Sequence, residues 1–155
     1  WAFCLMAVLA LGAAPMVHAD DRDDVEAVIN QYIDSEDFDL AEQTKLMASD
    51  RTYISGGMRY SNNDKSMALQ TAGNAVITAA NPDAQRIATL EDLEIRVNGN
   101  AAFASFYRTI NDTNSVENVR AGQDAMITIY QTATMVLFKT DDGWKIVHTH
   151  LSPTK

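Results

Sequence analysis

Apolar residues in the first half of the chain recur at the spacing of amphipathic helices. The first stripe predicts one helix and consists of Val25, Val28, Ile29, Tyr32 and Ile33. The pattern Asp39-Leu40-Ala41-Glu42 has the form of a capping box and predicts a second, short helix that reaches about residue 49. A third helix is expected over residues 62–80, with Asn81 and Pro82 ending it. Its predicted buried stripe is Leu69, Ala72, Val76 and Ala79.

Strand patterns surround and follow the third helix. Residues 51–55 and 58–60, separated by two glycines, predict a short hairpin. From residue 92 the apolar positions alternate with charged ones, and Asn98-Gly99 then gives a strong hairpin signal. The next strand is expected to run from residue 100 to about residue 110. The last two predicted strands are residues 126–139 and 144–151, joined by a turn at 140–143.

The first long hairpin predicts which side chains share a face. A turn centred on Asn98-Gly99 would pair Ile95 with Ala102 and Leu93 with Ala104. One face then holds Leu93, Ile95, Val97, Ala102, Ala104, Phe106 and Arg108. The other face holds Asp92, Glu94, Arg96, Phe103, Ser105 and Tyr107. Arg108 is therefore expected on the apolar face.

The order of elements predicts the fold class. Helices come first and four long strands afterwards, which is typical of α+β domains. The expected architecture is three helices packed on a curved antiparallel sheet, with a concave site between them where a small ligand can bind.

The N-terminal segment predicts export. Residues 1–17 carry no charge, Val17-His18-Ala19 has the spacing that signal peptidase accepts, and an acidic run begins at Asp20. We expect residues 1–19 to be a cleaved signal peptide and residues 20–155 to be one periplasmic or secreted domain. An uncleaved N-terminal anchor is the alternative, although the apolar run is short for a membrane span.

The composition bears on partners and stabilisation. The formal net charge is −9, and an acidic surface argues against nucleic acids and anionic membranes as partners of the mature form. Cys4 is the only cysteine and lies within the predicted signal, so we expect the mature domain to be stabilised without disulfides.

The order of elements and the C-terminal run resemble a known superfamily. The order is similar to that of the nuclear transport factor 2-like superfamily, which includes SnoaL-like proteins. The run Asp142–Ser152, with Trp144, His148 and His150, resembles the end of the association domain of calcium/calmodulin-dependent protein kinase II. The resemblance implies a cone-shaped roll, oligomerisation, and a basic pocket for small carboxylates. Three pocket arginines of that branch fall at Arg108, Met135 and Leu151, so only the first is retained.

Arg108 is the leading candidate for ligand binding. A guanidinium on an apolar face needs an anion or carbonyl acceptors, which a ligand can supply. The alternative is an internal salt bridge, for example to Glu91 or to a helix carboxylate. The full predicted ligand-binding set is Arg108, Tyr32, Tyr53, Met135, Thr149 and Leu151. Tyr60 and Tyr130 are further candidate hydroxyls, and each tyrosine alone is an ordinary feature of a core edge.

His148 and His150 are two residues apart and share a strand face. They could pass a proton or begin a metal site, but the pattern supplies no third ligand, so no metal or cofactor is expected. If the protein is an enzyme, the predicted catalytic set is His148, His150 and Arg108. The alternative is that the two histidines bond across the sheet or at a subunit interface.

Three functions remain open from the sequence. The preferred one is a non-catalytic binding domain for an anionic or carbonyl-bearing small molecule. The second is a cofactor-free enzyme such as an isomerase, cyclase, dehydratase or hydrolase. The third is an assembly domain whose pocket is filled by Met135, Leu137 and Leu151. A homodimer or larger oligomer is expected because Phe103, Tyr107 and Trp144 place aromatic side chains on the outer face.

Overall fold

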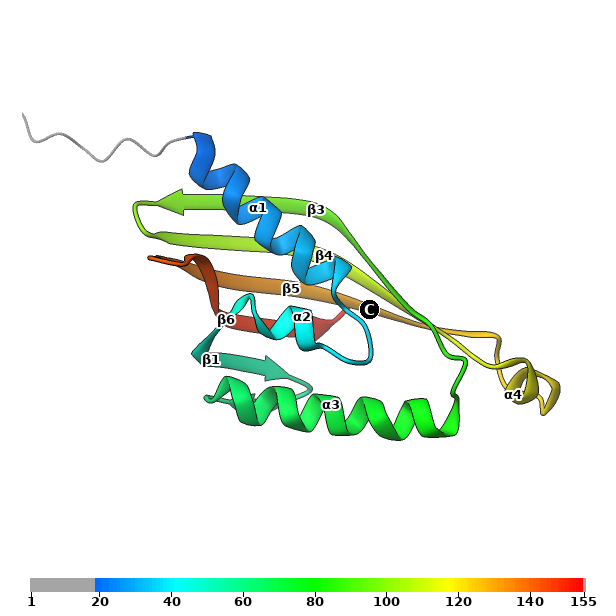
Figure 1. Cartoon of the computed structure of the whole chain (residues 1–155). Helices are drawn as coiled ribbons and strands as arrows, with labels where there is room; N and C mark the ends of the chain where they lie inside the picture. The colour runs from blue at the N-terminus through cyan, green and yellow to red at the C-terminus, as the bar shows by residue number, and fades with distance from the viewer. Residues whose placement is uncertain (1–18, 155) are drawn as a thin grey trace, which may run out of the picture.

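The computed structural model describes residues 19–154, which contain four helices and six strands (Figure 1). The helices are α1 (Ala19–Asp34), α2 (Ala41–Thr44), α3 (Asn63–Ala80) and α4 (Val116–Arg120). The strands are β1 (Met47–Ser55), β2 (Met58–Tyr60), β3 (Arg86–Asn98), β4 (Ala101–Thr113), β5 (Met126–Thr140) and β6 (Gly143–Pro153). The predicted α+β class is confirmed. The predicted signal peptide lies outside the described residues except for Ala19, where α1 begins.

One curved sheet forms the body of the fold, in the strand order β2-β1-β6-β5-β4-β3. Neighbouring strands are antiparallel except for β1 and β6, which run parallel. The prediction of an entirely antiparallel sheet is therefore wrong at this junction. Because β1 and β6 lie at opposite ends of the chain, no hairpin turn fixes their relative direction.

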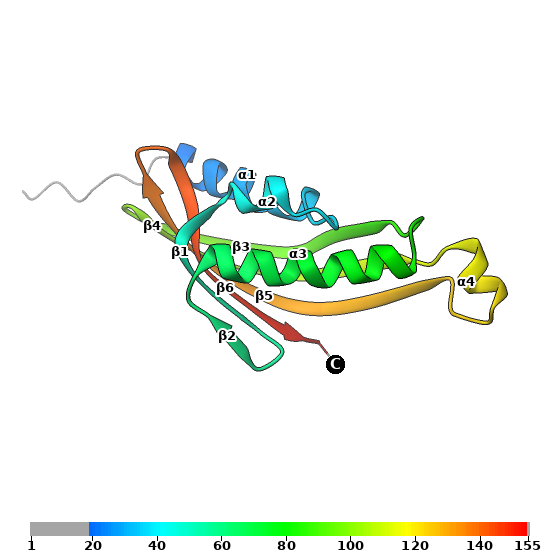
Figure 2. The same ribbon diagram turned by 60° about the horizontal axis from the view of Figure 1, so that its bottom comes forward.

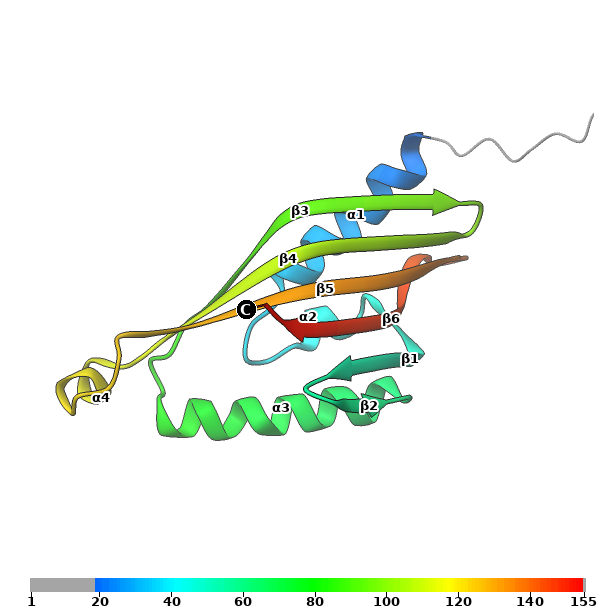
Figure 3. The same cartoon turned by 180° about the vertical axis from the view of Figure 1, so that it is seen from behind.

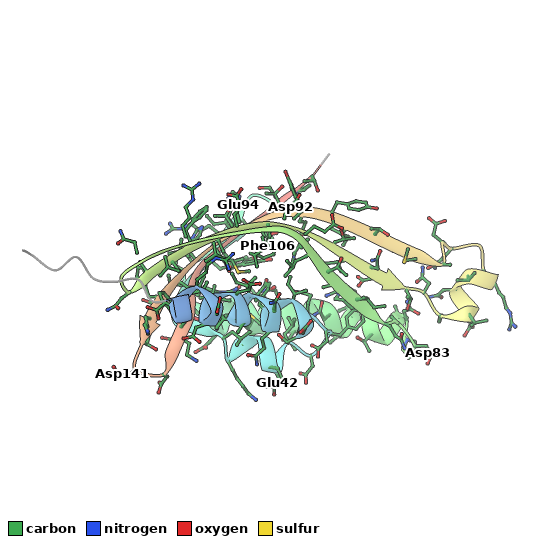
Figure 4. The ribbon with its side chains drawn as sticks, turned by 90° about the horizontal axis from the view of Figure 1, so that it is seen from above. Glu42, Asp83, Asp92, Glu94, Phe106 and Asp141 are labelled. Carbon is green, nitrogen blue, oxygen red and sulfur yellow. The ribbon has the colours of Figure 1, made fainter. Side chains whose placement is uncertain are left out.

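The helices α1, α2 and α3 lie on the concave side of the sheet (Figures 2 and 4). The apolar stripe of α1 is buried against it as predicted, with Val25 and Ile29 fully covered. Phe106 points to the helix side, whereas Asp92 and Glu94 lie on the convex side (Figure 4). The sheet face toward the helices therefore carries the core.

The β3–β4 hairpin keeps the predicted faces but not the predicted pairs. Its turn is centred on Gly99 and Asn100, and Val97 pairs with Ala102 instead of Asn100. Gly99 has φ 59° and takes the first central position, which a type II′ turn reserves for glycine. The register moves by two residues, which preserves the side-chain alternation, and Arg108 stays on the concave face.

The second helix differs from its prediction. α2 spans only Ala41–Thr44, and its N-cap is Leu40 in the left-handed conformation, with φ 60° and no side-chain cap. The Asp37 carboxylate instead accepts the backbone N–H groups of Asp39 and Leu40 at 3.0 and 2.7 Å. β1 then begins at Met47, which pairs with Ile146. The sequence had predicted that the helix continues at this position.

The third helix has the predicted ends but a different buried face. Asn62 caps its first turn by accepting from the Lys65 N–H at 2.9 Å. Leu69 and Val76 are 58% and 70% exposed, so the predicted apolar stripe faces outward. The buried residues are Asn63, Ser66, Met67 and Asn74. Hydrogen bonds such as Asn74 Nδ2 to the Phe38 carbonyl at 3.2 Å hold this polar face against the body.

The fourth helix was not predicted and lies at the far end of the β4–β5 arm (Figure 1). α4 has only five residues, and its N-cap Ser115 accepts from the Asn118 N–H at 3.2 Å. One turn and a half carries too little periodicity to be detected in sequence.

Within residues 19–154 no helix is long and apolar enough to cross a bilayer.

Candidate functional site

Two buried arginines face the helices from the concave side of the sheet. Arg108 lies on β4, where the alternation from Ala102 through Phe106 to Ile110 places every second residue in the core. Arg51 lies on β1 and is only 1% exposed. Burial of a guanidinium is costly unless acceptors meet it, so the surroundings of the two side chains decide what each can do.

Arg108 is paired with a carboxylate inside the protein. Its Nη1 donates to Glu36 Oε2 at 3.0 Å, and its Nε donates to Gln131 Oε1 at 2.7 Å. Desolvation lowers the pKa of Arg108, but the nearby Tyr32 and Glu36 outweigh it and the net shift of the pKa is upward. The interpretation of Arg108 as an internally paired cation is thus favoured, and Glu36 is its partner instead of Glu91.

The loop that follows α1 holds Glu36 in place. Glu36 N–H donates to the Ile33 carbonyl at 3.1 Å as the helix ends. Gln43 of α2 donates to Glu36 Oε2 at 2.7 Å and to the Tyr32 carbonyl at 3.1 Å. Arg86 also lies 4.0 Å from Glu36 Oε1, so the carboxylate is surrounded by donors from three elements.

Arg51 has much weaker contacts. Its Nη1 lies 3.4 Å from Thr149 Oγ1 and its Nη2 lies 3.5 Å from the Met67 sulfur. Its Nε has no hydrogen-bond partner, and no carboxylate forms a salt bridge with it among residues 19–154. Burial lowers the pKa of Arg51, and Tyr32, Tyr53 and Glu36 oppose that shift without reversing it. Arg51 is therefore a buried cation that the protein leaves largely uncompensated.

Each of the two arginines has a tyrosine beside it. The Tyr32 hydroxyl is 3.4 Å from Arg108 Nη1, and burial raises the pKa of Tyr32 to about 12, so the phenol stays protonated at neutral pH. The Arg51 guanidinium lies over the Tyr53 ring, 4.9 Å from its centroid, in a cation–π contact. The two phenol groups and the two guanidinium groups form one electrostatically connected site on the concave face.

Sheet pairing brings four of the predicted ligand-binding residues into one part of the concave face. Tyr53 pairs with Thr149, and Thr149 pairs with Met135 on the next strand. Leu151 lies two residues after Thr149 on β6. Met135 and Leu151 are both buried in the apolar core. Thr149 contacts Arg51, whereas Tyr32 contacts Arg108. The polar candidates therefore gather around two arginines, and the apolar ones form the floor.

The histidines do not join this site. His148 and His150 lie on the convex face of β6, because a register shift before His148 reverses the alternation that begins with buried Trp144. His150 is exposed and its Nε2 lies 3.2 Å from Ser152 Oγ. The sheet separates both rings from Arg108, so the predicted catalytic trio is not assembled. Within residues 19–154 no three His, Cys, Asp or Glu side chains gather as a metal site requires.

The remaining tyrosine candidates lie elsewhere. Tyr60 of β2 stacks with Tyr53, with ring centroids 6.3 Å apart, and Tyr130 is exposed near the far end of β5.

Sequence reasoning missed Arg51, although a signal existed. Arg51 and Tyr53 are two apart in a predicted strand, so period-two alternation already placed them on one face.

The comparisons with known proteins agree with this architecture. A profile of the SnoaL-like domain matches residues 25–155, which is most of the chain. The chain belongs to the SnoaL-like domain family. No curated protein matches this SnoaL-like chain.

Solved structures share the fold of this SnoaL-like domain at low identity. An NTF2-like family member from Streptomyces avermitilis, named as a candidate dehydratase, has 16% identity and a TM-score of 0.70, covering 88% of this chain and 98% of its own. The association domain of C. elegans CaMKII has 17% identity and a TM-score of 0.64, with 86% and 95% covered. A candidate ketosteroid isomerase from Shewanella frigidimarina has 18% identity and a TM-score of 0.58, with 83% and 94% covered. The predicted resemblance to the superfamily and to the association domain is confirmed at the level of fold.

Proposed function

We propose that this SnoaL-like domain binds a small anionic molecule through Arg51, on the concave face of its sheet. The observation that carries the proposal is the buried Arg51 guanidinium, whose only polar contacts in the described residues are a hydroxyl at 3.4 Å and a thioether at 3.5 Å. Thioether sulfur is a weak acceptor. An anionic ligand would provide the strong acceptors that these neighbours do not.

The contrast with Arg108 supports the choice of Arg51. Both side chains are buried, but Arg108 already has a carboxylate at 3.0 Å and an amide oxygen at 2.7 Å. A ligand anion at Arg108 would have to compete with Glu36, which Gln43 also holds. Among residues 19–154 no carboxylate competes for Arg51 in this way. The anchor proposed from the sequence therefore moves from Arg108 to Arg51, while the chemical class of the ligand stays the same.

Catalysis is the second candidate, since two solved structures of this fold carry names of candidate enzymes. A cofactor-free isomerase or dehydratase needs a carboxylate or phenolate that can take a proton. Glu36 is the buried carboxylate of the site, and Arg108 and Gln43 occupy its Oε2. Burial holds the pKa of Tyr32 at about 12, which suits a donor and not a base. Binding without chemistry accounts better for these contacts.

Self-association belongs to the same proposal. The convex sheet face is not covered by α1, α2 or α3 (Figure 3), and it exposes Phe103 and Tyr107. Trp144 was also predicted on this outer face. That part of the prediction is wrong, because Trp144 is only 4% exposed and lies in the core. The likeness to an association domain supports a role in assembly, as does the filling of the concave face by Met135, Leu137 and Leu151. Neither feature explains the uncompensated Arg51.

We also propose that the domain acts outside the cytoplasm after removal of residues 1–19. The uncharged run and the Val17-His18-Ala19 pattern support it. N-terminal sequencing of protein expressed with its leader should find Asp20 first. A mature chain that keeps Leu5–Leu11 would contradict export by this route.

Ligand binding is tested by melting the wild type and Arg51→Met with a panel of small carboxylates, phosphate and sulfate. At least one carboxylate should raise the wild-type melting temperature in a concentration-dependent way, because binding to the folded state alone stabilises it. Arg51→Met should weaken that acid by at least about 30-fold, the loss expected when one partner of a buried charged contact is removed. Absence of a shift for every anion in the wild type would overturn the proposal.

A further inference from the structure

A groove of about 280 Å³ runs between the β1–β2 hairpin and the N-terminal half of α3. Its lining residues that matter here are Tyr53, Met58, Tyr60, Ser66, Leu69 and Gln70. Its size suits a small organic molecule and not a peptide or a large cofactor.

The walls of the groove are mainly apolar and partly aromatic. Tyr53 and Tyr60 stack at a centroid distance of 6.3 Å and an interplanar angle of 28°, which gives an aromatic wall on the hairpin side. Met58 and Leu69 are each 58% exposed where they line the groove. Exposed apolar side chains that line a concave site gain free energy when an apolar group covers them.

One end of the groove lies next to Arg51. Tyr53 lines the groove and also carries the Arg51 guanidinium over its ring, 4.9 Å from the centroid. Gln70 also lines it and places its Nε2 3.7 Å from the Met67 sulfur. That same sulfur lies 3.5 Å from Arg51 Nη2. A single thioether therefore lies between a groove residue and the uncompensated cation.

Met67 is well suited to be displaced. Methionine is unbranched, has three rotatable side-chain bonds, and adapts to new packing more readily than other apolar residues. Its sulfur is a weak acceptor for Arg51, so a carboxylate that replaced it would form a charge-assisted hydrogen bond in its place. Movement of Met67 can thus open the groove onto Arg51 without breaking a strong hydrogen bond.

We propose that the ligand is a small aryl-substituted monocarboxylic acid. Its carboxylate displaces the Met67 sulfur and binds Arg51, and its ring lies in the groove against Tyr53, Tyr60 and Leu69. This inference rests on the proposed anion site at Arg51 and adds the class of molecule that the site selects. The stacked tyrosines favour a flat ring, and pairing with the one guanidinium of Arg51 needs one carboxylate.

Calorimetric titration of the full domain with acetate, benzoate, 3-phenylpropanoate and the neutral 3-phenylpropanamide tests this class. The wild type should bind 3-phenylpropanoate at least about tenfold more tightly than acetate, because only the aryl acid covers the groove. The amide should bind more weakly than the acid, since it cannot pair with the charge of Arg51. An amide that binds as tightly as the acid would overturn the proposal.

A matched pair of α3 variants isolates the groove. Leu69→Gln should weaken 3-phenylpropanoate about fivefold and leave acetate unchanged, because Leu69 lines the groove proposed for the ring. Val76→Gln is the control: it is two helical turns away on the same helix face, is 70% exposed, and does not line the groove. Both positions face solvent, so neither substitution removes core packing. Equal losses in the two variants would contradict a ring site at Leu69.

The outcomes separate this inference from the function on which it rests. If acetate and 3-phenylpropanoate bind equally and both are lost in Arg51→Met, the aryl specificity is overturned and the anion site stands. If the aryl acid binds equally well to Arg51→Met, its carboxylate does not use Arg51 and the inference is overturned. If no acid binds the wild type, the proposed function is overturned as well.

Discussion

The Arg51 guanidinium lies 3.5 Å from the Met67 sulfur, and this weak contact replaces the carboxylate that a buried arginine normally requires. Arg108, on the same concave face, has its carboxylate in Glu36 at 3.0 Å. Substitution by methionine should therefore change the stability of the domain in opposite directions at the two arginines.

Arg51→Met should stabilise the ligand-free domain, by about 1–3 kcal/mol in the free energy of unfolding. The reason is that a poorly compensated buried charge is replaced by an apolar side chain. Urea unfolding of the wild type and the variant, in buffer without organic acids, measures the difference. A loss of stability would mean that Arg51 is a structural residue.

Arg108→Met should destabilise the domain by about 3–5 kcal/mol, because it leaves Glu36 as a buried carboxylate without its main partner. Glu36 and Arg108 side chains are 9% and 6% exposed, so water cannot replace the contact. The same urea experiment measures this loss of stability. The double variant Arg108→Met/Glu36→Gln should recover part of the loss, and failure to recover any would point to packing as the cause.

The free energy of unfolding should fall as the pH drops below about 6.5 because of His148. Burial lowers the pKa of His148 below its usual value of 6.5, and His150, Arg51 and Arg59 act in the same direction. A lowered pKa in the folded state means that the unfolded chain binds more protons in this window, so stability is full above pH 6.5 and falls below it. His148→Gln should flatten this part of the curve in denaturant titrations at several pH values. A slope unchanged by the variant would exclude His148 as a source.

Two glycines should respond oppositely to alanine, although an added Cβ meets nothing within 4 Å at either. Gly99 has φ 59°, so Gly99→Ala should cost about 1–2 kcal/mol of stability through backbone strain. Gly73 lies inside α3 with helical φ, so Gly73→Ala should add about 0.5–1 kcal/mol. Thermal melts of both variants check the pair, and equal effects would contradict the turn geometry at Gly99.

The domain should sediment as a dimer or larger at micromolar concentration through its convex face. Phe103→Glu should shift it toward the monomer, because the substitution places a charge in the proposed contact face. Leu69→Glu on α3 serves as the control, since it adds the same charge to an exposed apolar residue outside that face. A wild type that sediments only as a monomer would contradict self-association.

Local patterns in the chain predicted most of the elements. The stripe from Val25 to Ile33 predicted α1, and the alternation around Phe106 and Arg108 predicted β4 with the correct residues on the concave face. These features depend on the periods of helix and strand, which are properties of neighbouring residues. The error in the register at Gly99 did not change which side chains share a face, because a shift of two residues preserves the alternation.

Tertiary contacts decided the rest. Periodicity marked α3 but not its buried side, which Asn74 and Met67 occupy because their partners come from distant segments. The pairing of Arg108 with Glu36 joins residues 72 positions apart, and the isolation of Arg51 depends on which residues fail to reach it. The sequence by itself determined the class, most of the elements and the presence of a buried guanidinium. Only folding in three dimensions decided which guanidinium is compensated, since compensation is a matter of distances between chain segments that no local pattern encodes.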